Sequence, residues 1–103
     1  MLILLAKKED LKSRIEHFVS AKLAPSLKGE EKATLSSNIE NNKPIFVGNW
    51  CIGWKARPDG FIKIIFEHVN SIKKEDLDQI KTSGTASIVE DLLLRNAQQG
   101  DSQ

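Results

Sequence analysis

Apolar residues between positions 10 and 23 recur at intervals of four, three, one and four. This spacing places them along one stripe of a helix and predicts an amphipathic α-helix over residues 10–23. The helix is expected to stop before Pro25, because a proline ring disfavours helical geometry in the residue ahead of it. The stripe consists of Leu11, Ile15, Phe18, Val19 and Leu23.

Two neighbouring segments leave alternatives open. The apolar run at residues 2–6 continues the heptad spacing back from Leu11, which would extend the helix, but a short apolar run also suits a separate buried strand. Residues 26–43 are polar, with three Ser, three Asn and Gly29, although Ala33, Leu35 and Ile39 supply enough apolar contact for one short helix. The sequence does not decide whether that second helix forms.

β-Branched and aromatic residues dominate from Pro44 to Val69, and these types favour a pleated surface. We expect an antiparallel sheet at about 44–69. Pro58 and Gly60 in the turn at 57–60 suit a hairpin loop. Residues 48–49 form either a second tight turn, which gives a three-stranded meander, or a bulge in one long strand, which leaves two strands. The meander is favoured slightly.

Two helices are expected after the sheet. Ser71 is placed to cap a helix that runs through Ile80 and ends at Gly84. Thr85 is placed to cap a last helix, in which Ile88, Val89, Leu92 and Leu93 form an apolar face. The polar tail over 97–103 is expected to fray.

These elements predict an α+β fold in one domain over residues 1–103. Its parts are one N-terminal helix, with the second left open, an antiparallel meander of two or three strands at about 44–69, and two C-terminal helices packing on one sheet face. In this arrangement the helices cover a single face of the sheet.

Composition narrows the class of protein. The 103 residues are 40% hydrophobic and 28% charged, which is typical of a globular domain large enough for a core without metal or disulfide support. Because 15 basic residues stand against 14 acidic ones, no global field attracts nucleic acid or anionic lipid. The lone Cys51 excludes an internal disulfide and favours a reducing compartment. The apolar run at 2–6 is too short for an export signal or a membrane span, so a cytoplasmic location without membrane contact is expected.

No motif for catalysis, metal or cofactor binding is visible. His17, His68 and Cys51 form no spaced ligand pair. Cys51 lies between Trp50 and Ile52 in an apolar strand, where it is most simply a core residue. The adjacent carboxylate pairs point about 100° apart on a helix and share no site, and the glycines match no phosphate-binding pattern. We therefore expect no catalytic residues, no metal and no cofactor.

One group of side chains on the hairpin is a candidate binding site, and it comprises Trp50, Trp54, Lys55, Arg57 and Lys63. Alternation places both tryptophans on one sheet face and Lys55 on the other, and the turn brings Arg57 near both lysines. Tryptophan with arginine is typical of protein-interface hot spots, whereas aromatics among cations also stack the bases of single-stranded nucleic acid. The simplest interpretation remains that the tryptophans are core residues under the first and last helices.

The resulting hypothesis is a small non-catalytic protein-binding module, such as a stoichiometric inhibitor, immunity protein or adaptor. It requires only a shaped surface, with another protein as the partner. The alternative is a nucleic-acid-binding module that uses the hairpin. Homodimerisation through an unpaired strand edge or the last helix is compatible with either hypothesis.

Overall fold

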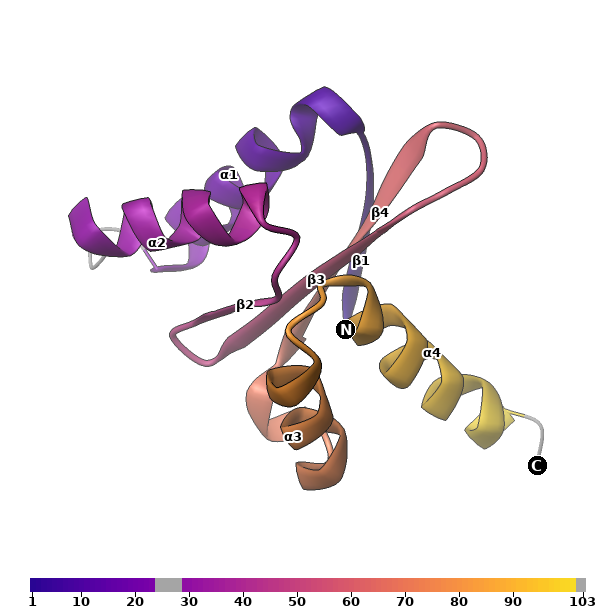
Figure 1. Ribbon diagram of the computed structural model, residues 1–103. Helices are drawn as coiled ribbons and strands as arrows, with labels where there is room; N and C mark the ends of the chain where they lie inside the picture. Colours follow the sequence, from indigo (N-terminus) through magenta and orange to yellow (C-terminus); the bar gives the residue numbers. More distant parts are fainter. Residues whose placement is uncertain (24–28, 102–103) are drawn as a thin grey trace.

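The computed structural model describes residues 1–23 and 29–101, and it shows an antiparallel sheet between two pairs of helices (Figure 1). The four strands follow the order β1-β4-β3-β2. Helices α1 (Leu11–Leu23) and α2 (Gly29–Glu40) lie on one side, and α3 (Lys74–Ser83) and α4 (Ser87–Asp101) lie on the other. The predicted α+β fold is confirmed.

The sheet has one strand more than the predicted meander. Strands β2 (Ile45–Val47), β3 (Trp50–Ala56) and β4 (Phe61–His68) form that meander, and β1 (Leu2–Lys7) joins it on the far side of β4. The apolar run at the start of the chain is therefore a strand. Six consecutive residues of β1 pair with β4, which satisfies the backbone groups along an edge of β4 that would otherwise have no partner.

Both predicted turns are present. Gly48 has φ 58° between β2 and β3, and Gly60 has φ 90° in the hairpin, so each glycine supplies the positive φ that its turn needs. The Arg57 N–H donates to the Phe61 carbonyl at 2.8 Å and closes the hairpin. The segment at 48–49 is thus a tight turn rather than a bulge.

The helix predicted over residues 10–23 is confirmed, since α1 follows a short 3-10 helix, η1 (Lys8–Asp10), and ends at Leu23. Helix α2 realises the option left open for residues 26–43, although 26–28 lie outside the described residues, as does Pro25. Within the residues that the structure describes, none of the helices is both long and apolar enough to span a bilayer.

Two predicted caps were wrong. Ser71 belongs to another 3-10 helix, η2 (Val69–Ser71), and α3 begins at Lys74 without a side-chain cap. The reason is Ile72, which is buried and extended and so separates Ser71 from the helix. The Thr85 hydroxyl donates to the Ser83 carbonyl, and α4 begins only at Ser87.

Of the two C-terminal helices, α3 ends where the sequence predicted, and α4 extends further than predicted. Gly84 ends α3 as predicted, with φ 65° and its N–H donating to the Ile80 carbonyl at 3.2 Å. Helix α4 includes residues 97–101, where a frayed tail was expected. Fraying itself stays a prediction, and 102–103 lie outside the described residues.

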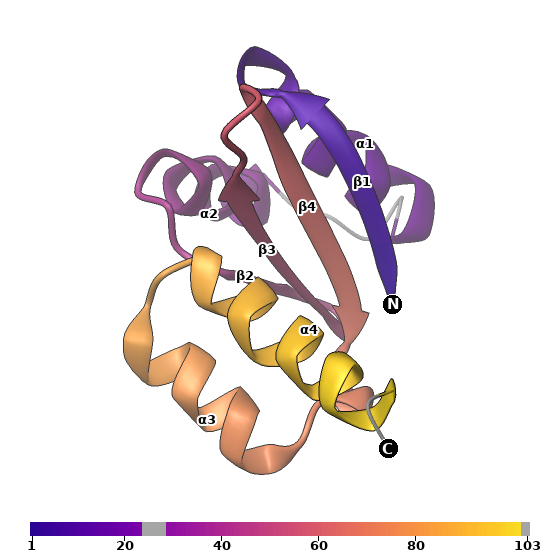
Figure 2. The same cartoon turned by 90° about the vertical axis from the view of Figure 1, so that its right-hand side faces the viewer.

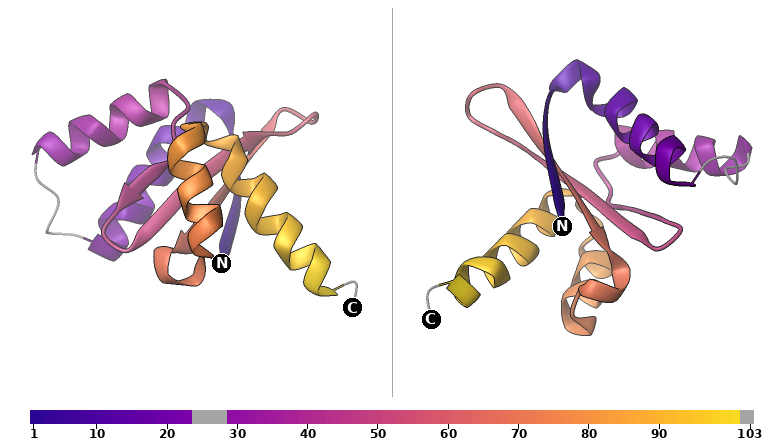
Figure 3. Two further views of the ribbon diagram at one scale, coloured as in Figure 1. Left: turned by 60° about the horizontal axis from the view of Figure 1, so that its bottom comes forward. Right: turned by 180° about the vertical axis from the view of Figure 1, so that it is seen from behind.

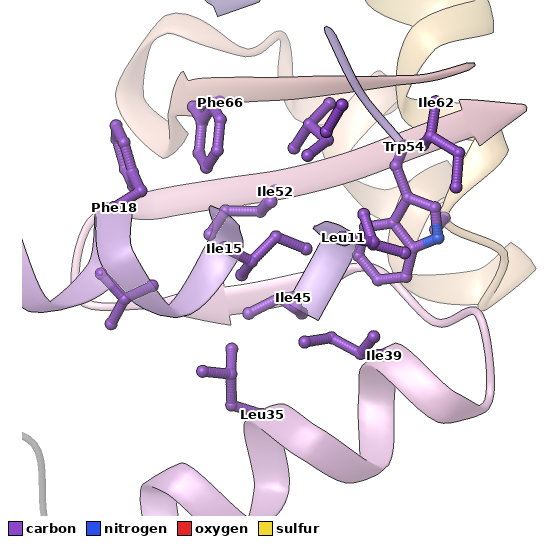
Figure 4. Packing of buried hydrophobic residues seen from close by; sticks show 14 residues of the cluster. Leu11, Ile15, Phe18, Leu35, Ile39, Ile45, Ile52, Trp54, Ile62 and Phe66 are labelled. Carbon is purple, nitrogen blue, oxygen red and sulfur yellow. The ribbon is translucent and has the colours of Figure 1, made fainter. Parts of the chain in front are cut away.

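Helices cover both faces of the sheet, which corrects the expectation of a single covered face. The C-terminal pair packs on one face as predicted (Figure 3), whereas α1 and α2 cover the other and form a separate core with it (Figure 4). The physical reason lies in β4, where the consecutive residues Ile64, Ile65 and Phe66 are all 0% exposed. A strand with apolar residues on both sides must be buried on both faces.

Gly53 in β3 allows α4 to pack directly on the sheet backbone. A Cβ atom at this position would overlap the Val89 side chain and lie 2.7 Å from the Ala86 carbonyl oxygen. That carbonyl accepts a hydrogen bond from the backbone N–H of Trp54 at 3.3 Å. The start of α4 is therefore held on β3 at a distance that only glycine permits.

Replacing Gly53 with alanine should lower the free energy of unfolding by about 3 kcal/mol, because the new methyl group forces α4 away from the sheet. Urea denaturation followed by tryptophan fluorescence measures this loss. Gly84→Ala is the matched control, because its Cβ meets nothing within 4 Å. Its free energy of unfolding should fall by only about 1 kcal/mol, the cost of placing alanine in a left-handed backbone conformation. Equal losses in the two variants would contradict the proposed close contact.

Candidate functional site

A cleft with a volume of about 810 Å³ opens at the hairpin end of the sheet. Its walls come from the β3–β4 turn, η1 and the start of α1, the end of α2, and the loop between α3 and α4. We call this the hairpin-end cleft. Its floor includes Leu11, Ile39, Trp54, Ala56, Ile62 and Ala86, and its rim carries Lys8, Glu9, Lys12, Glu40, Lys55 and Arg57.

Trp54 joins the cleft walls through hydrogen bonds. Its indole N–H donates to the Asn42 side-chain oxygen at 3.4 Å. The Asn42 carbonyl in turn accepts from the Ala86 N–H at 2.8 Å. Asn42 adopts φ 55°, a left-handed conformation that asparagine tolerates better than most residues. The loops that follow α2 and α3 are thereby tied to β3 at one point.

Of the two predicted tryptophans, Trp54 is a core residue and Trp50 packs partly buried against the core. Trp54 is 4% exposed and lies with Leu11 and Ile39 beneath α1 and α2 (Figure 4). Trp50 is half-buried, with its ring 5.0 Å from that of Phe18 and 3.9 Å from that of His68. Both tryptophans pack under the N-terminal helices, whereas the last helix packs on the opposite face.

The three predicted cations each form an ion pair. Lys55 lies 2.8 Å from Asp91, and Lys63 lies 2.8 Å from Glu90, so two residues of α4 neutralise the hairpin lysines. The hydrogen bond and charge of Asp91 raise the pKa of Lys55 above its usual value. These two lysines therefore face α4 rather than the tryptophans.

At the hairpin tip, Arg57 pairs with Asp59 at 3.0 Å. The Phe61 backbone N–H, with help from Arg57, lowers the pKa of the Asp59 carboxyl. Trp54, Lys55 and Arg57 meet at the hairpin-end cleft, whereas Trp50 and Lys63 do not line it. Partner binding by these five residues stays a prediction.

Sequence reasoning missed most of the cleft rim. Lys8 and Lys12 are four residues apart at the start of the first helix, which is the spacing that places side chains on one helical face. That signal was available. Glu40 and Asn42 gave no signal, because they reach the cleft only through the way α2 packs against β3.

Cys51, which the sequence predicts to be a core residue, is fully buried between the sheet and α3 and α4. Burial, with a contribution from the Glu67 charge, raises the pKa of its thiol to about 12. The reactive thiolate is therefore disfavoured in the folded protein. Among the residues that the structure describes, no three His, Cys, Asp or Glu side chains gather where they could hold a metal ion.

Comparison with protein-family models, with curated proteins and with solved structures finds no match to this chain.

The buried thiol should make stability fall at high pH. Below its ordinary pKa of 9.0, Cys51 is protonated in both the folded and the unfolded chain. Above it, only the unfolded chain releases the proton, so the free energy of unfolding should fall by about 1.4 kcal/mol per pH unit toward pH 12.

Urea denaturation at pH 8 and at about pH 10.5 tests this in the wild type and in Cys51→Ala, which serves as the control. Other groups that titrate in this range act on both proteins, so the difference between them isolates the thiol. A stability difference between the two proteins that does not change with pH would contradict a buried neutral thiol.

Proposed function

We propose that this chain is a non-catalytic protein-binding module, and that its partner inserts apolar side chains of an exposed segment into the hairpin-end cleft. The observation that carries the proposal is an apolar floor built around Trp54 inside a rim of charged side chains. A cleft of about 810 Å³ falls within the size range of ligand sites in proteins. It can hold a few side chains of a peptide segment, but not a folded domain.

The rim favours a segment in which carboxylates flank the apolar residues. Lys8 and Lys12 form no ion pair with other described residues, and they are exposed. Lys55 and Arg57 do have partners, but these pairs are about half exposed, and such pairs contribute little to stability. Both cations can therefore turn to a partner's carboxylates at small cost.

The cleft is already formed in the free protein, which supports binding without a large ordering penalty. The hydrogen bonds of Trp54 and Asn42 fix the loops that make its walls. A partner then loses less free energy to ordering than it would at a flexible surface. A stoichiometric inhibitor, an immunity protein or an adaptor in the cytoplasm would use a site of this kind.

The alternative of nucleic-acid binding has one supporting observation, the four cations on the rim. Its support is weaker because helices cover both sheet faces, Trp54 is buried, and Trp50 is half-buried against Phe18 rather than on an open stacking surface. Two carboxylates, those of Glu9 and Glu40, also lie on the rim. Affinity that falls steeply with salt would favour this alternative, since phosphate contacts release counterions.

Arg57→Glu should weaken partner binding at least tenfold, because it places a negative charge where the partner's carboxylates are expected. The partner is first isolated from lysate by affinity capture, with nuclease-treated and untreated arms. Calorimetry with the purified partner then gives the dissociation constants. A tenfold change corresponds to about 1.4 kcal/mol of binding free energy.

Arg14→Glu is the matched control, because Arg14 is exposed on α1 but does not line the cleft. It should bind as the wild type does. Equal affinity of Arg57→Glu and Arg14→Glu would remove the hairpin-end cleft from the interface. If the partner is captured from the untreated lysate but not from the nuclease-treated one, the partner is a nucleic acid rather than a protein.

A further inference from the structure

The outer edge of β1 is the most apolar exposed surface among the described residues. Six large apolar side chains in the described chain are exposed, and four of them fall within residues 1–5. Along this edge β1 pairs with no other described strand. The four side chains are Met1 at 52%, Leu2 at 43%, Ile3 at 41% and Leu5 at 53% exposed.

Apart from Lys7 at its end, β1 lacks the residues that usually prevent edge-to-edge pairing. Residues 2–6 contain no proline, no glycine and no charge, and their register with β4 is continuous without a bulge. The opposite edge differs, because β2 has only three residues and the Lys81 ammonium lies 5.6 Å from the centre of the Phe46 ring. Among the described strands, β1 therefore offers the longer apolar edge for a further strand.

The exposed side chains of β1 alternate between the two faces of the sheet. Ile3 lies opposite Ile65, and Leu5 lies opposite Lys63. Ile65 packs with α3 and α4, and Lys63 binds Glu90 of α4, so Ile3 and Leu5 are on the α4 side. An added strand could therefore bury apolar side chains against these two residues.

The shape of the molecule at this edge favours a single extended segment over a second copy of the chain. Figure 2 shows that α1 crosses behind β1 and projects beyond its outer edge. Two copies that paired through β1 would be related by a two-fold axis perpendicular to the sheet. That axis would bring both α1 helices to the same side of the joined sheet, where each would project toward the other copy. A single added strand brings no second helix to that side.

Charge indicates which end of the added segment is acidic. Lys7 and Lys8 are exposed at the C-terminal end of β1 and form no ion pair with other described residues. A segment antiparallel to β1 would begin beside these lysines, where carboxylates are favoured. Its following residues would lie beside the apolar part of the strand.

We propose that β1 receives an extended segment of another protein as a fifth, antiparallel strand. The segment carries carboxylates at its start and apolar side chains opposite Leu5 and Ile3. Main-chain hydrogen bonds supply affinity and the alternate side chains supply specificity, as in other cases of strand addition. Lys8 also lies on the rim of the hairpin-end cleft, but the residues of β1 do not line it, so either proposal can fail while the other holds.

The probe is the acetylated, amidated peptide Glu-Glu-Thr-Val-Thr-Val-Thr-Val. With its second glutamate opposite Lys7, its first two valines lie opposite Leu5 and Ile3. Titration into the isotope-labelled full chain should shift the amide resonances of Leu2–Lys7. The absence of shifts there at about 1 mM peptide, a limit of about 4 kcal/mol in binding free energy, would overturn the proposal.

Two N-methylated forms of the peptide test main-chain pairing. Successive N–H groups of a strand point to opposite edges. Methylation of the valines therefore removes the N–H donors along one edge of the peptide, and methylation of the threonines removes those along the other edge. One form should lose binding and the other should keep it. Equal binding by both forms would show contact through side chains alone and would overturn strand addition.

Leu5→Glu should weaken peptide binding at least tenfold, because it places a charge in the apolar contact. Phe46→Glu is the matched control, since Phe46 is an exposed apolar residue on the opposite edge strand. It should leave peptide affinity unchanged. Sedimentation velocity should show a monomer for the free chain. A dimer that Leu5→Glu abolishes would overturn the proposal in favour of self-pairing.

Discussion

The close approach of α4 to the backbone of β3 at Gly53 is the contact on which much of the structure depends. Because no side chain intervenes, the Ala86 carbonyl can bond to the Trp54 N–H, and Val89 lies directly on the sheet. The direction of α4 across the sheet is then set. That direction places Glu90 and Asp91 over Lys63 and Lys55, and it places the loop before α4 in the wall of the hairpin-end cleft.

This arrangement changes the chemistry of the hairpin. On β3 alone, Lys55 and Trp54 would belong to one exposed ribbon that suits a negatively charged polymer. With α4 packed on one face and α1 and α2 on the other, the lysine is paired and the tryptophan is core. At this end of the sheet the exposed surface is the hairpin-end cleft with its apolar floor.

Local patterns in the sequence predicted the elements better than their assembly. The four-residue spacing of Leu11 and Ile15 and the glycines at the turns act over a few residues, and the helix and turns they predict are present. Ser71 failed as a cap because the burial of Ile72, a tertiary effect, was stronger than a local preference. The cleft joins segments as distant as Lys8 and Ala86, so no local pattern could show it. Gly53 within an apolar strand was a visible signal of close packing.

The two sheet edges show how the chain distributes its apolar surface. At β2 the strand is short, and the Lys81 ammonium lies 5.6 Å from the centre of the Phe46 ring. At β1 the strand is long and apolar, and α1 extends past it (Figure 2). Because α1 reaches beyond the last strand, it could cover a wider sheet than the four strands of this chain form. The part of α1 that extends past the sheet and the exposed Ile3 and Leu5 lie at the same edge. A strand from another protein would give the outer backbone groups of β1 hydrogen-bond partners and would bury these two side chains.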